Sequence, residues 1–159
     1  MKNNKLSLSI IVPVYNEEKT ILKILERLNK LNKLCKIEII VVNDGSKDQS
    51  RTIIENNSNL YDKSIHLSKN KGKGKAVIEG LKQSECDYVL VQDADLEYDP
   101  SDYEKLIKPI ENGYADVVYG SRFIGSEEKR VLYFWHSLGN FILTSISNMF
   151  TNLNLTDME

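Results

Sequence analysis

The chain has 159 residues, a net charge of −2 and 41% hydrophobic residues, as expected for one soluble globular domain with a sizeable core. Lysine and arginine are spread along the sequence, which argues against a broad basic face for nucleic acid. The two cysteines, Cys35 and Cys86, are too few for a disulfide framework and indicate reduced thiols in a cytosolic protein. No apolar run reaches the length of a membrane span, and residues 1–18 do not have the pattern of a signal peptide.

Segments with strand character and segments with helix character alternate along the chain. The first is a β-branched apolar run, and the second repeats apolar residues at helical spacing. Ser101 and Glu104 have the spacing of a capping box at the start of a later helix. In chain order, we predict strand 8–14, helix 17–34, strand 38–42, helix 48–56, strand 64–67, helix 74–84, strand 88–91, helix 101–111, strand 115–119 and helix 131–151.

Strands that are apolar on both faces and alternate with helices are typical of a parallel sheet covered on both sides. The expected fold class is therefore α/β, a Rossmann-like three-layer α/β/α arrangement with a mainly parallel central sheet. Ligands of such sheets bind beyond the carboxyl ends of the strands. Polar groups follow predicted strands at that end, at 15–17, 43–45, 93–95 and 120–122. We therefore expect these groups to form one site at this rim of the sheet.

Asp93 and Asp95 flank Ala94 just after the predicted strand 88–91, and Glu97 adds a further carboxylate. Mg²⁺ and Mn²⁺ prefer oxygen ligands and complete their coordination with water and substrate phosphates. The spacing therefore indicates a divalent-metal site. A solvated acidic turn explains the same residues, so the motif alone leaves both interpretations open.

Other polar segments also have a functional and a structural interpretation. Asp44 can accept a hydrogen bond from a base or a ribose, or it can form an Asx turn with Gly45. The basic, glycine-spaced loop 70–75 can place N–H groups and ammonium charges near phosphate, or it can be a solvated loop. Arg122 and Arg130 suit bidentate contacts with phosphate, and they suit ion pairs with acidic neighbours equally.

In this order, these segments resemble the family 2 glycosyltransferases, which have the GT-A fold. The resemblance covers nearly the whole chain. It includes an opening strand with a donor-contacting turn, a second donor motif, a loop with a helix start, and a metal motif. The segments that carry it are IVPVYNE (11–17), VNDGS (42–46), GKGKA (72–76) and QDADLE (92–97).

The segment 72–76 resembles that of the dolichyl-phosphate sugar synthase branch, and further segments narrow the resemblance to the bacterial polyprenyl-phosphate hexosyltransferases. These segments are DADLEYDP (93–100), GSRF (120–123) and LTDME (155–159). That branch implies inverting transfer of a hexose from a nucleotide-diphosphate sugar, of the GDP-mannose or UDP-glucose class, to a polyprenyl or dolichyl phosphate. It implies Mg²⁺ or Mn²⁺ as the cofactor and a lipid phosphate as the acceptor, with no nucleic acid partner.

The resemblance also implies roles for individual residues. The expected metal ligands are Asp93, Asp95 and Glu97. The expected contacts to the nucleotide donor are Pro13, Tyr15, Glu17, Asp44, Lys75, Asp93 and Ala94. The expected catalytic set is Asp95, Arg122, Arg130 and Asp157.

The acceptor decides which of these groups the chemistry requires. A phosphate monoester has its second pKa near ~6, so at neutral pH it is already an anion that needs cationic positioning rather than a strong base. Arg122 and Arg130 are the candidates for that role. A sugar hydroxyl would instead need a carboxylate base, for which Asp157 is the candidate.

Alternative functions remain open at this point. One is a family 2 transferase that acts on a sugar hydroxyl in cell-surface polysaccharide synthesis, and another is a non-catalytic donor-binding fragment. A sugar nucleotidyltransferase would have a glycine-rich loop after the first strand, where this chain has the segment 13–16, PVYN.

We expect residues 1–159 to form a single nucleotide-sugar-binding and catalytic domain that is incomplete at its C-terminus, because the chain ends inside what resembles a longer family motif. We expect a cytoplasmic protein, with the cytoplasmic face of the membrane as a candidate location. Peripheral association with the membrane would then use the missing C-terminal part.

Overall fold

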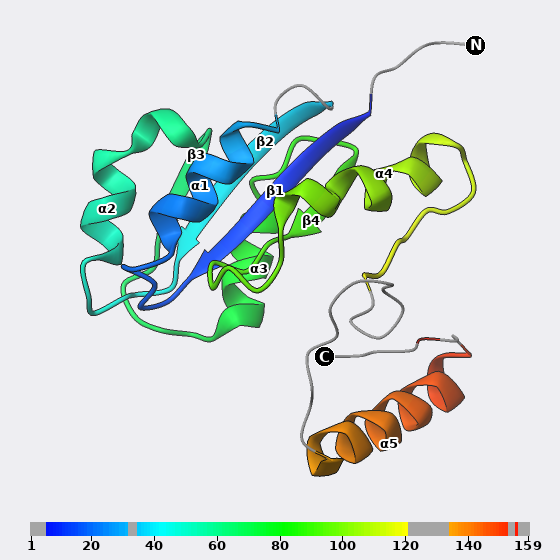
Figure 1. The fold of residues 1–159 in the computed structure, drawn as a ribbon. Helices are drawn as coiled ribbons and strands as arrows, with labels where there is room; N and C mark the ends of the chain where they lie inside the picture. Colours follow the sequence, from blue (N-terminus) through cyan, green and yellow to red (C-terminus); the bar gives the residue numbers. More distant parts are fainter. Residues whose placement is uncertain (1–5, 32–34, 121–133, 153–154, 156–159) are drawn as a thin grey trace.

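The computed structural model of the chain describes residues 6–31, 35–120, 134–152 and 155. Strands and helices alternate over most of this part (Figure 1). The elements are β1 Ser7–Val14, α1 Ile21–Asn29, β2 Lys36–Asn43, α2 Ser50–Asn56, η1 Ser58–Leu60, β3 Lys63–His66, α3 Lys73–Leu81, β4 Tyr88–Val91, η2 Pro100–Asp102, α4 Tyr103–Glu111 and α5 Phe134–Thr151. The first eight elements predicted from the sequence, from strand 8–14 to helix 101–111, are confirmed with shifted ends.

The strands form a four-stranded sheet in the order β3-β2-β1-β4, and every neighbouring pair is parallel. Ile11 of β1 lies opposite Ile40 of β2 on one side and Val91 of β4 on the other. The order places the carboxyl ends of β1, β2 and β4 next to one another. The predicted parallel sheet is therefore confirmed.

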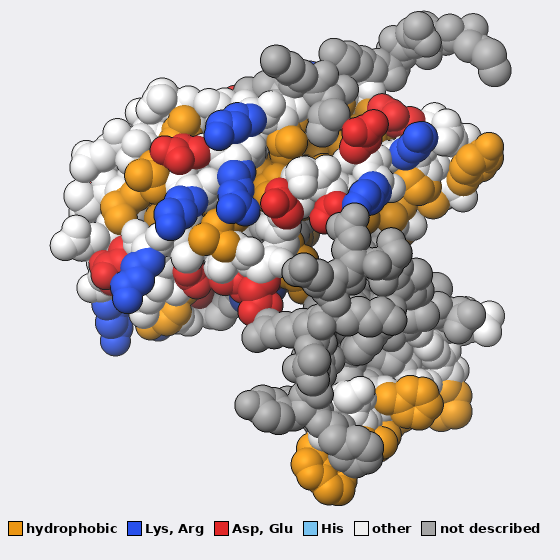
Figure 2. Space-filling model, in the orientation of Figure 1, with side chains coloured by type: hydrophobic (Ala, Val, Ile, Leu, Met, Phe, Trp, Pro, Cys, Tyr) orange, Lys and Arg blue, Asp and Glu red, His pale blue; other side chains and the backbone are white. Residues whose placement is uncertain are grey.

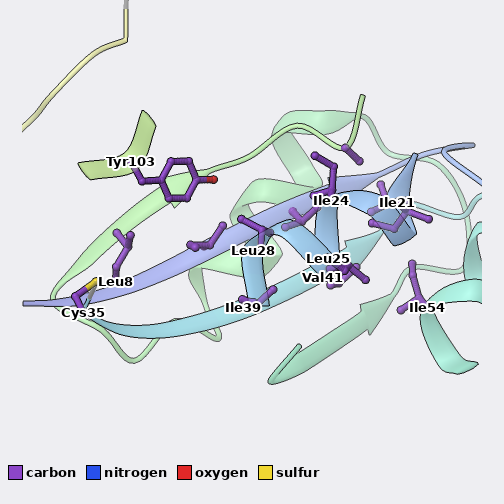
Figure 3. Packing of buried hydrophobic residues seen from close by; sticks show 14 of the residues in the cluster. Leu8, Ile21, Ile24, Leu25, Leu28, Cys35, Ile39, Val41, Ile54 and Tyr103 are labelled. Atoms are coloured by element: carbon purple, nitrogen blue, oxygen red, sulfur yellow. The ribbon is translucent and has the colours of Figure 1, made fainter. Parts of the chain in front are cut away.

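Helices α1, α2 and α4 cover one face of the sheet. Alternate side chains of β1, from Leu8 to Val14, point to this face and are almost completely buried. They pack against Ile24, Leu25 and Leu28 of α1, whose apolar residues repeat at helical spacing (Figure 3). Ile54 of α2 and Tyr103 and Ile107 of α4 extend the same cluster.

Helix α3 covers the other face, where Ile11, Ile40, Val42 and Ala76 form a second buried cluster. The helix lies close to β1 because Gly80 has no side chain. A Cβ atom added at Gly80 would lie 2.5 Å from Cγ2 of Ile11. The close approach fixes α3, and with it the loop that precedes α3, relative to the end of β1.

The capping box predicted for Ser101 and Glu104 is wrong. Asp99 is the capping residue, and its Oδ1 accepts a hydrogen bond of 2.9 Å from the backbone N–H of Ser101. Pro100 begins a 3-10 turn that leads into α4. An Asp before a Pro satisfies the first free N–H of such a turn as well as Ser would have done.

The strand predicted over 115–119 is also wrong. These residues have no strand pairing among the described residues, and Val117 and Tyr119 are mostly exposed. A β-branched apolar run forms a strand only where a neighbouring strand supplies its hydrogen-bond partners, and β4 remains the edge of the described sheet.

The last predicted helix appears as α5, while residues 131–133 of the prediction lie outside the described residues. Its exposed apolar side chains include Trp135, Phe141, Met149 and Phe150. Figure 2 shows hydrophobic side chains gathered in the region of α5, whereas both acidic and basic side chains are scattered over the sheet part of the molecule. In the described part of the chain, α5 included, no helix has the length and apolarity needed to cross a bilayer.

Candidate functional site

An open pocket of about 320 Å³ lies at the carboxyl ends of β1, β2 and β4. Three separate segments supply most of its wall, as the rim of a parallel sheet predicts. The loop before α3 and the first turns of that helix supply the rest. The lining residues are Pro13, Val14, Tyr15, Glu17, Asp44, Asn70, Lys73, Ala76, Asp93, Ala94 and Asp95.

The loops after β1 and β2 hold each other in place by reciprocal hydrogen bonds. The backbone N–H of Asn16 donates to Oγ of Ser46 at 3.0 Å, and the N–H of Lys47 donates back to Oδ1 of Asn16 at 2.8 Å. The N–H of Glu17 donates to Oγ of Ser50 at 2.8 Å. Asn16 has φ of 58°, a conformation that Asn tolerates better than most residues. This framework fixes Tyr15 and Glu17 in the pocket lining.

Asp44 is buried and joins β2 to the loop before α3. Its Oδ1 accepts from the N–H of Lys71 at 2.9 Å, and its Oδ2 accepts from the N–H of Gly72 at 2.8 Å. Each carboxylate oxygen can accept more than one hydrogen bond, so these contacts leave capacity for a ligand donor. Asp44 does not form the local Asx turn that the sequence allowed, because Oδ1 of Asn43 accepts from the N–H of Ser46 at 3.0 Å and the partners of Asp44 are in another loop.

Gly45 allows that loop to approach the end of β2. It has φ of +66°, and a Cβ atom there would lie 2.6 Å from the backbone carbon of Lys69. Both observations exclude an ordinary side chain at this position. The close backbone contact keeps the segment 69–72 against β2.

Asp93 and Asp95 follow β4 and differ in their partners. Nζ of Lys73 contacts both oxygens of Asp93, at 2.7 Å from Oδ1 and 2.8 Å from Oδ2. Oδ1 of Asp95 accepts from the N–H of Glu97 at 3.0 Å, in a tight local turn. Asp93 is half-buried, whereas Asp95 is exposed at the edge of the pocket.

Gln92 and Tyr103, to which the sequence assigned no role, support this acidic loop by hydrogen bonds. Buried Gln92 donates from Nε2 to the carbonyl of Asp93 at 2.9 Å, and its Oε1 accepts from the O–H of Tyr103 at 2.5 Å. Burial raises the pKa of Tyr103 above its ordinary value, so the phenol stays protonated and donates. Leu96 has φ of 68°, a strained conformation for a leucine, in the same turn.

The donor set fits a hard divalent cation held by two carboxylates. Asp93 and Asp95 offer oxygen atoms in one pocket, which suits Mg²⁺ or Mn²⁺ when substrate phosphates and water supply the other ligands. The predicted third ligand, Glu97, does not line the pocket. Among the described residues, no group of three or more His, Cys, Asp or Glu side chains is arranged to hold a metal.

The structure brings most of the predicted site residues of its described part together. Pro13, Tyr15, Glu17, Asp44, Asp93, Ala94 and Asp95 line the pocket. Lys75 does not line it and instead contacts Glu79 at 2.8 Å. Hydrogen bonds from Lys75 and Lys82 lower the pKa of Glu79 to about 2. The predicted catalytic residues Arg122, Arg130 and Asp157 lie outside the described residues.

Sequence reasoning missed some lining residues, namely Val14, Asn70, Lys73 and Ala76. Lys73 matters most, because its ammonium is the basic group of the pocket lining. Lys73 and Lys75 are two positions apart, and successive positions of a helix differ by about 100°, so only one of them can face a given pocket. The sequence indicated that the glycine-spaced loop 70–75 lies at the site. Only the structure shows that Lys73, and not Lys75, lines the pocket.

Comparisons with known proteins identify the family of the chain. The sequence model of glycosyl transferase family 2 matches residues 9–157. The chain belongs to this family. It is 36% identical over 120 residues to a dolichol-phosphate mannosyltransferase of Pyrococcus furiosus, covering 75% of this chain and 34% of that protein. It is 38% identical over 125 residues to an undecaprenyl-phosphate 4-deoxy-4-formamido-L-arabinose transferase of Proteus mirabilis, covering 74% and 36%. The chain thus spans about a third of the length of these relatives.

The chain has the GT-A fold, as its superposition on solved structures of other proteins shows. A TarS fragment of S. aureus superposes with a TM-score of 0.60 at 28% identity, over 76% of this chain and 40% of that one. A glucosyl-3-phosphoglycerate synthase of Mycobacterium tuberculosis superposes with a TM-score of 0.56 at 22% identity, over 67% and 40%. That structure contains Mn²⁺, UDP and glucosyl-3-phosphoglycerate. Its low identity to this chain supports the fold alone.

Proposed function

We propose that this family 2 glycosyltransferase chain binds a nucleotide-diphosphate sugar with Mg²⁺ or Mn²⁺ and supplies the donor half of an inverting hexosyltransferase that acts on a polyprenyl or dolichyl phosphate. The observation that supports this most directly is the pocket that Asp93 and Asp95 line together with Tyr15, Glu17 and Asp44. Acidic, aromatic and basic groups from four segments converge there, which a solvated acidic turn would not require.

The β1/β2 side of the pocket, which consists of Tyr15, Glu17 and Asp44, suits the nucleoside. Tyr15 offers a partly exposed aromatic ring for stacking on a base. The carboxylates of Glu17 and Asp44 are acceptors for base N–H or ribose O–H groups. The hydrogen bonds between the two loops hold these groups ready before a ligand arrives, which lowers the entropic cost of binding.

The β4 side, which consists of Lys73, Asp93 and Asp95, suits the diphosphate. Asp93 and Asp95 would hold the divalent cation, and Lys73 adds a positive charge. A bound cation would neutralise charge that develops on the leaving nucleoside diphosphate. Gln92 keeps the acidic loop in position through the carbonyl of Asp93.

The acceptor class comes from the relatives rather than from the pocket. The relatives in Pyrococcus furiosus and Proteus mirabilis are named for dolichol phosphate and undecaprenyl phosphate. A lipid phosphate is already anionic at neutral pH, so this chain's Arg122 and Arg130 would position it without a general base. A sugar-hydroxyl acceptor would require Asp157 as base instead.

Calorimetric titration of the chain with UDP and GDP, each with MgCl₂, MnCl₂ or EDTA, tests the donor half. We expect one nucleoside diphosphate to bind with metal and to bind at least about tenfold more weakly with EDTA, since the metal bridges protein and phosphates. No binding of either nucleotide at millimolar concentration with either metal would sink the proposal. Transfer from the matching radiolabelled sugar nucleotide to a short polyprenyl phosphate, rather than to a sugar hydroxyl, then tests the acceptor class.

A further inference from the structure

The Lys73–Asp93 ion pair links the two kinds of ligand that this pocket is proposed to bind. The ammonium of Lys73 contacts both oxygens of the Asp93 carboxylate, at 2.7 Å and 2.8 Å. Those oxygens are the ones that the proposed function assigns to the divalent cation. A divalent cation and an ammonium compete for the same lone pairs and repel each other at close range.

The backbone before α3 keeps Lys73 at the pocket when its side chain moves. Asp44 holds the N–H groups of Lys71 and Gly72, and Gly45 packs against the backbone of Lys69. Lys73 begins α3, directly after this anchored segment. Its side chain is mostly exposed and has four rotatable carbons, so the ammonium can change partners while the backbone stays in place.

We propose that Lys73 is an exchangeable counter-ion: it holds Asp93 when no metal is bound, and it moves to the diphosphate of the donor when the metal takes Asp93. This inference rests on the proposed function. Lys73 thereby weakens the binding of metal alone and strengthens the binding of the metal–nucleotide pair. The chain then takes up metal and donor together rather than metal by itself, and Lys73 is a positioning residue of the donor site.

Two affinities that change in opposite directions test the exchange. Lys73→Met should raise the affinity for Mn²⁺ alone, measured by electron paramagnetic resonance of free Mn²⁺, by about two- to fivefold, the range expected for losing one exposed ion pair. The same variant should bind UDP or GDP about tenfold more weakly at saturating Mn²⁺, since a charge-assisted phosphate contact is lost. Lys71→Met is the matched control, because it removes a charge from the same loop with no effect on the Asp93 pair, and both affinities should change less than about twofold.

A second set of variants tests the exchange without metal. Asp93→Asn should free Lys73 and raise the affinity for UDP or GDP in EDTA by about threefold, and the gain should disappear in Asp93→Asn/Lys73→Met. Asp95→Asn removes the same charge without touching Lys73 and should give a smaller gain. Equilibrium dialysis with labelled nucleotide measures these variants together with wild type and Lys73→Met, which is the reference for the double variant.

The outcomes separate the inference from the function on which it rests. If wild-type protein binds the nucleotide with Mn²⁺ but Lys73→Met binds Mn²⁺ no more tightly than Lys71→Met, the exchange is overturned and the donor site stands. The exchange is also overturned if Asp93→Asn raises the nucleotide affinity in EDTA equally in the wild-type and the Lys73→Met background. If wild-type protein binds neither Mn²⁺ nor nucleotide, both the proposed function and the exchange are overturned.

Discussion

The two sides of the pocket are held in different ways. On the β1/β2 side, the two loops exchange backbone-to-side-chain hydrogen bonds through Asn16, Ser46 and Ser50. On the β4 side, a hydrogen bond from Gln92 and the ion pair between Asp93 and Lys73 hold the acidic loop. The first side is therefore preorganised, whereas the second can exchange its partners. Such a division suits a ligand whose nucleoside is recognised as a rigid shape and whose diphosphate arrives with a cation.

The largest effect is expected where the β1/β2 side is packed most tightly. Gly45→Ala should lower the free energy of unfolding by about 3–4 kcal/mol, because the new Cβ meets the Lys69 backbone and the backbone is in a left-handed conformation. Gly113→Ala is the control, since Gly113 also has positive φ but has nothing within 4 Å of the added Cβ. It should cost only about 1 kcal/mol. Urea unfolding measures both, and equal losses would show that the close contact contributes nothing.

The next effect tests the β4 side. Asp95→Asn should weaken metal-dependent binding of the nucleoside diphosphate by about 100-fold, or roughly 2.7 kcal/mol, because a cation ligand is lost. Glu97→Gln, in the same loop but outside the pocket lining, should change it by less than about threefold. Calorimetry with Mn²⁺ measures both variants. Equal losses would mean that Glu97, as the sequence predicted, is a ligand after all.

The support beneath the acidic loop is expected to contribute less. Tyr103→Phe leaves the Oε1 atom of Gln92 without its donor and should cost about 1–2 kcal/mol of stability. Because Gln92 also holds the carbonyl of Asp93, we expect a several-fold loss of nucleotide affinity with Mn²⁺ as well. A loss of stability with unchanged affinity would show that the acidic loop keeps its shape without this contact.

The same variant has a defined pH dependence. Burial raises the pKa of Tyr103 above its ordinary value of 10.0, so its contribution to stability is complete below pH 10 and is lost as the pH rises toward the folded-state value. The stability difference between wild type and Tyr103→Phe should therefore stay constant up to about pH 9 and shrink between about pH 10 and about pH 12. Thermal unfolding at matched ionic strength measures it, and a constant difference would contradict a buried, protonated phenol.

The smallest effect concerns a single bond between the two loops. Ser46→Ala removes the acceptor for the N–H of Asn16, and since that N–H can reach water, stability should fall by only about 0.5–1 kcal/mol. Nucleotide affinity should fall by less than about threefold, because Ser50 still holds the N–H of Glu17. A larger loss of affinity would mean that the β1/β2 side depends on this one contact for its preorganisation.

The hydrophobic patterns of single segments were enough to predict the strands and helices of the parallel sheet. The β-branched run of β1 and the helical spacing in α1 led to the parallel sheet, and the rim rule then brought Tyr15, Asp44 and Asp93 together. The strand predicted over 115–119 failed because its pairing depends on a neighbour rather than on its own residues.

The site was predictable as a set of loops but not as a set of contacts. Nothing local to Lys73 and Lys75 tells which one turns toward Asp93. The bonds from Asp44 to the loop before α3 span 27 and 28 positions, and the contact of Gln92 with Tyr103 depends on how α4 packs on the sheet. Such contacts follow from tertiary packing. The sequence therefore indicated the pocket but not the hydrogen bonds and ion pairs within it.

The most direct test of the metal–diphosphate site compares UDP with UMP, and GDP with GMP, on the wild-type chain with Mn²⁺ and with EDTA. A cation held by Asp93 and Asp95 beside the phosphates should tighten the diphosphate by at least about tenfold and the monophosphate by much less, because the cation's remaining ligands come from the diphosphate. Equal affinity for the diphosphate with Mn²⁺ and with EDTA would contradict the account.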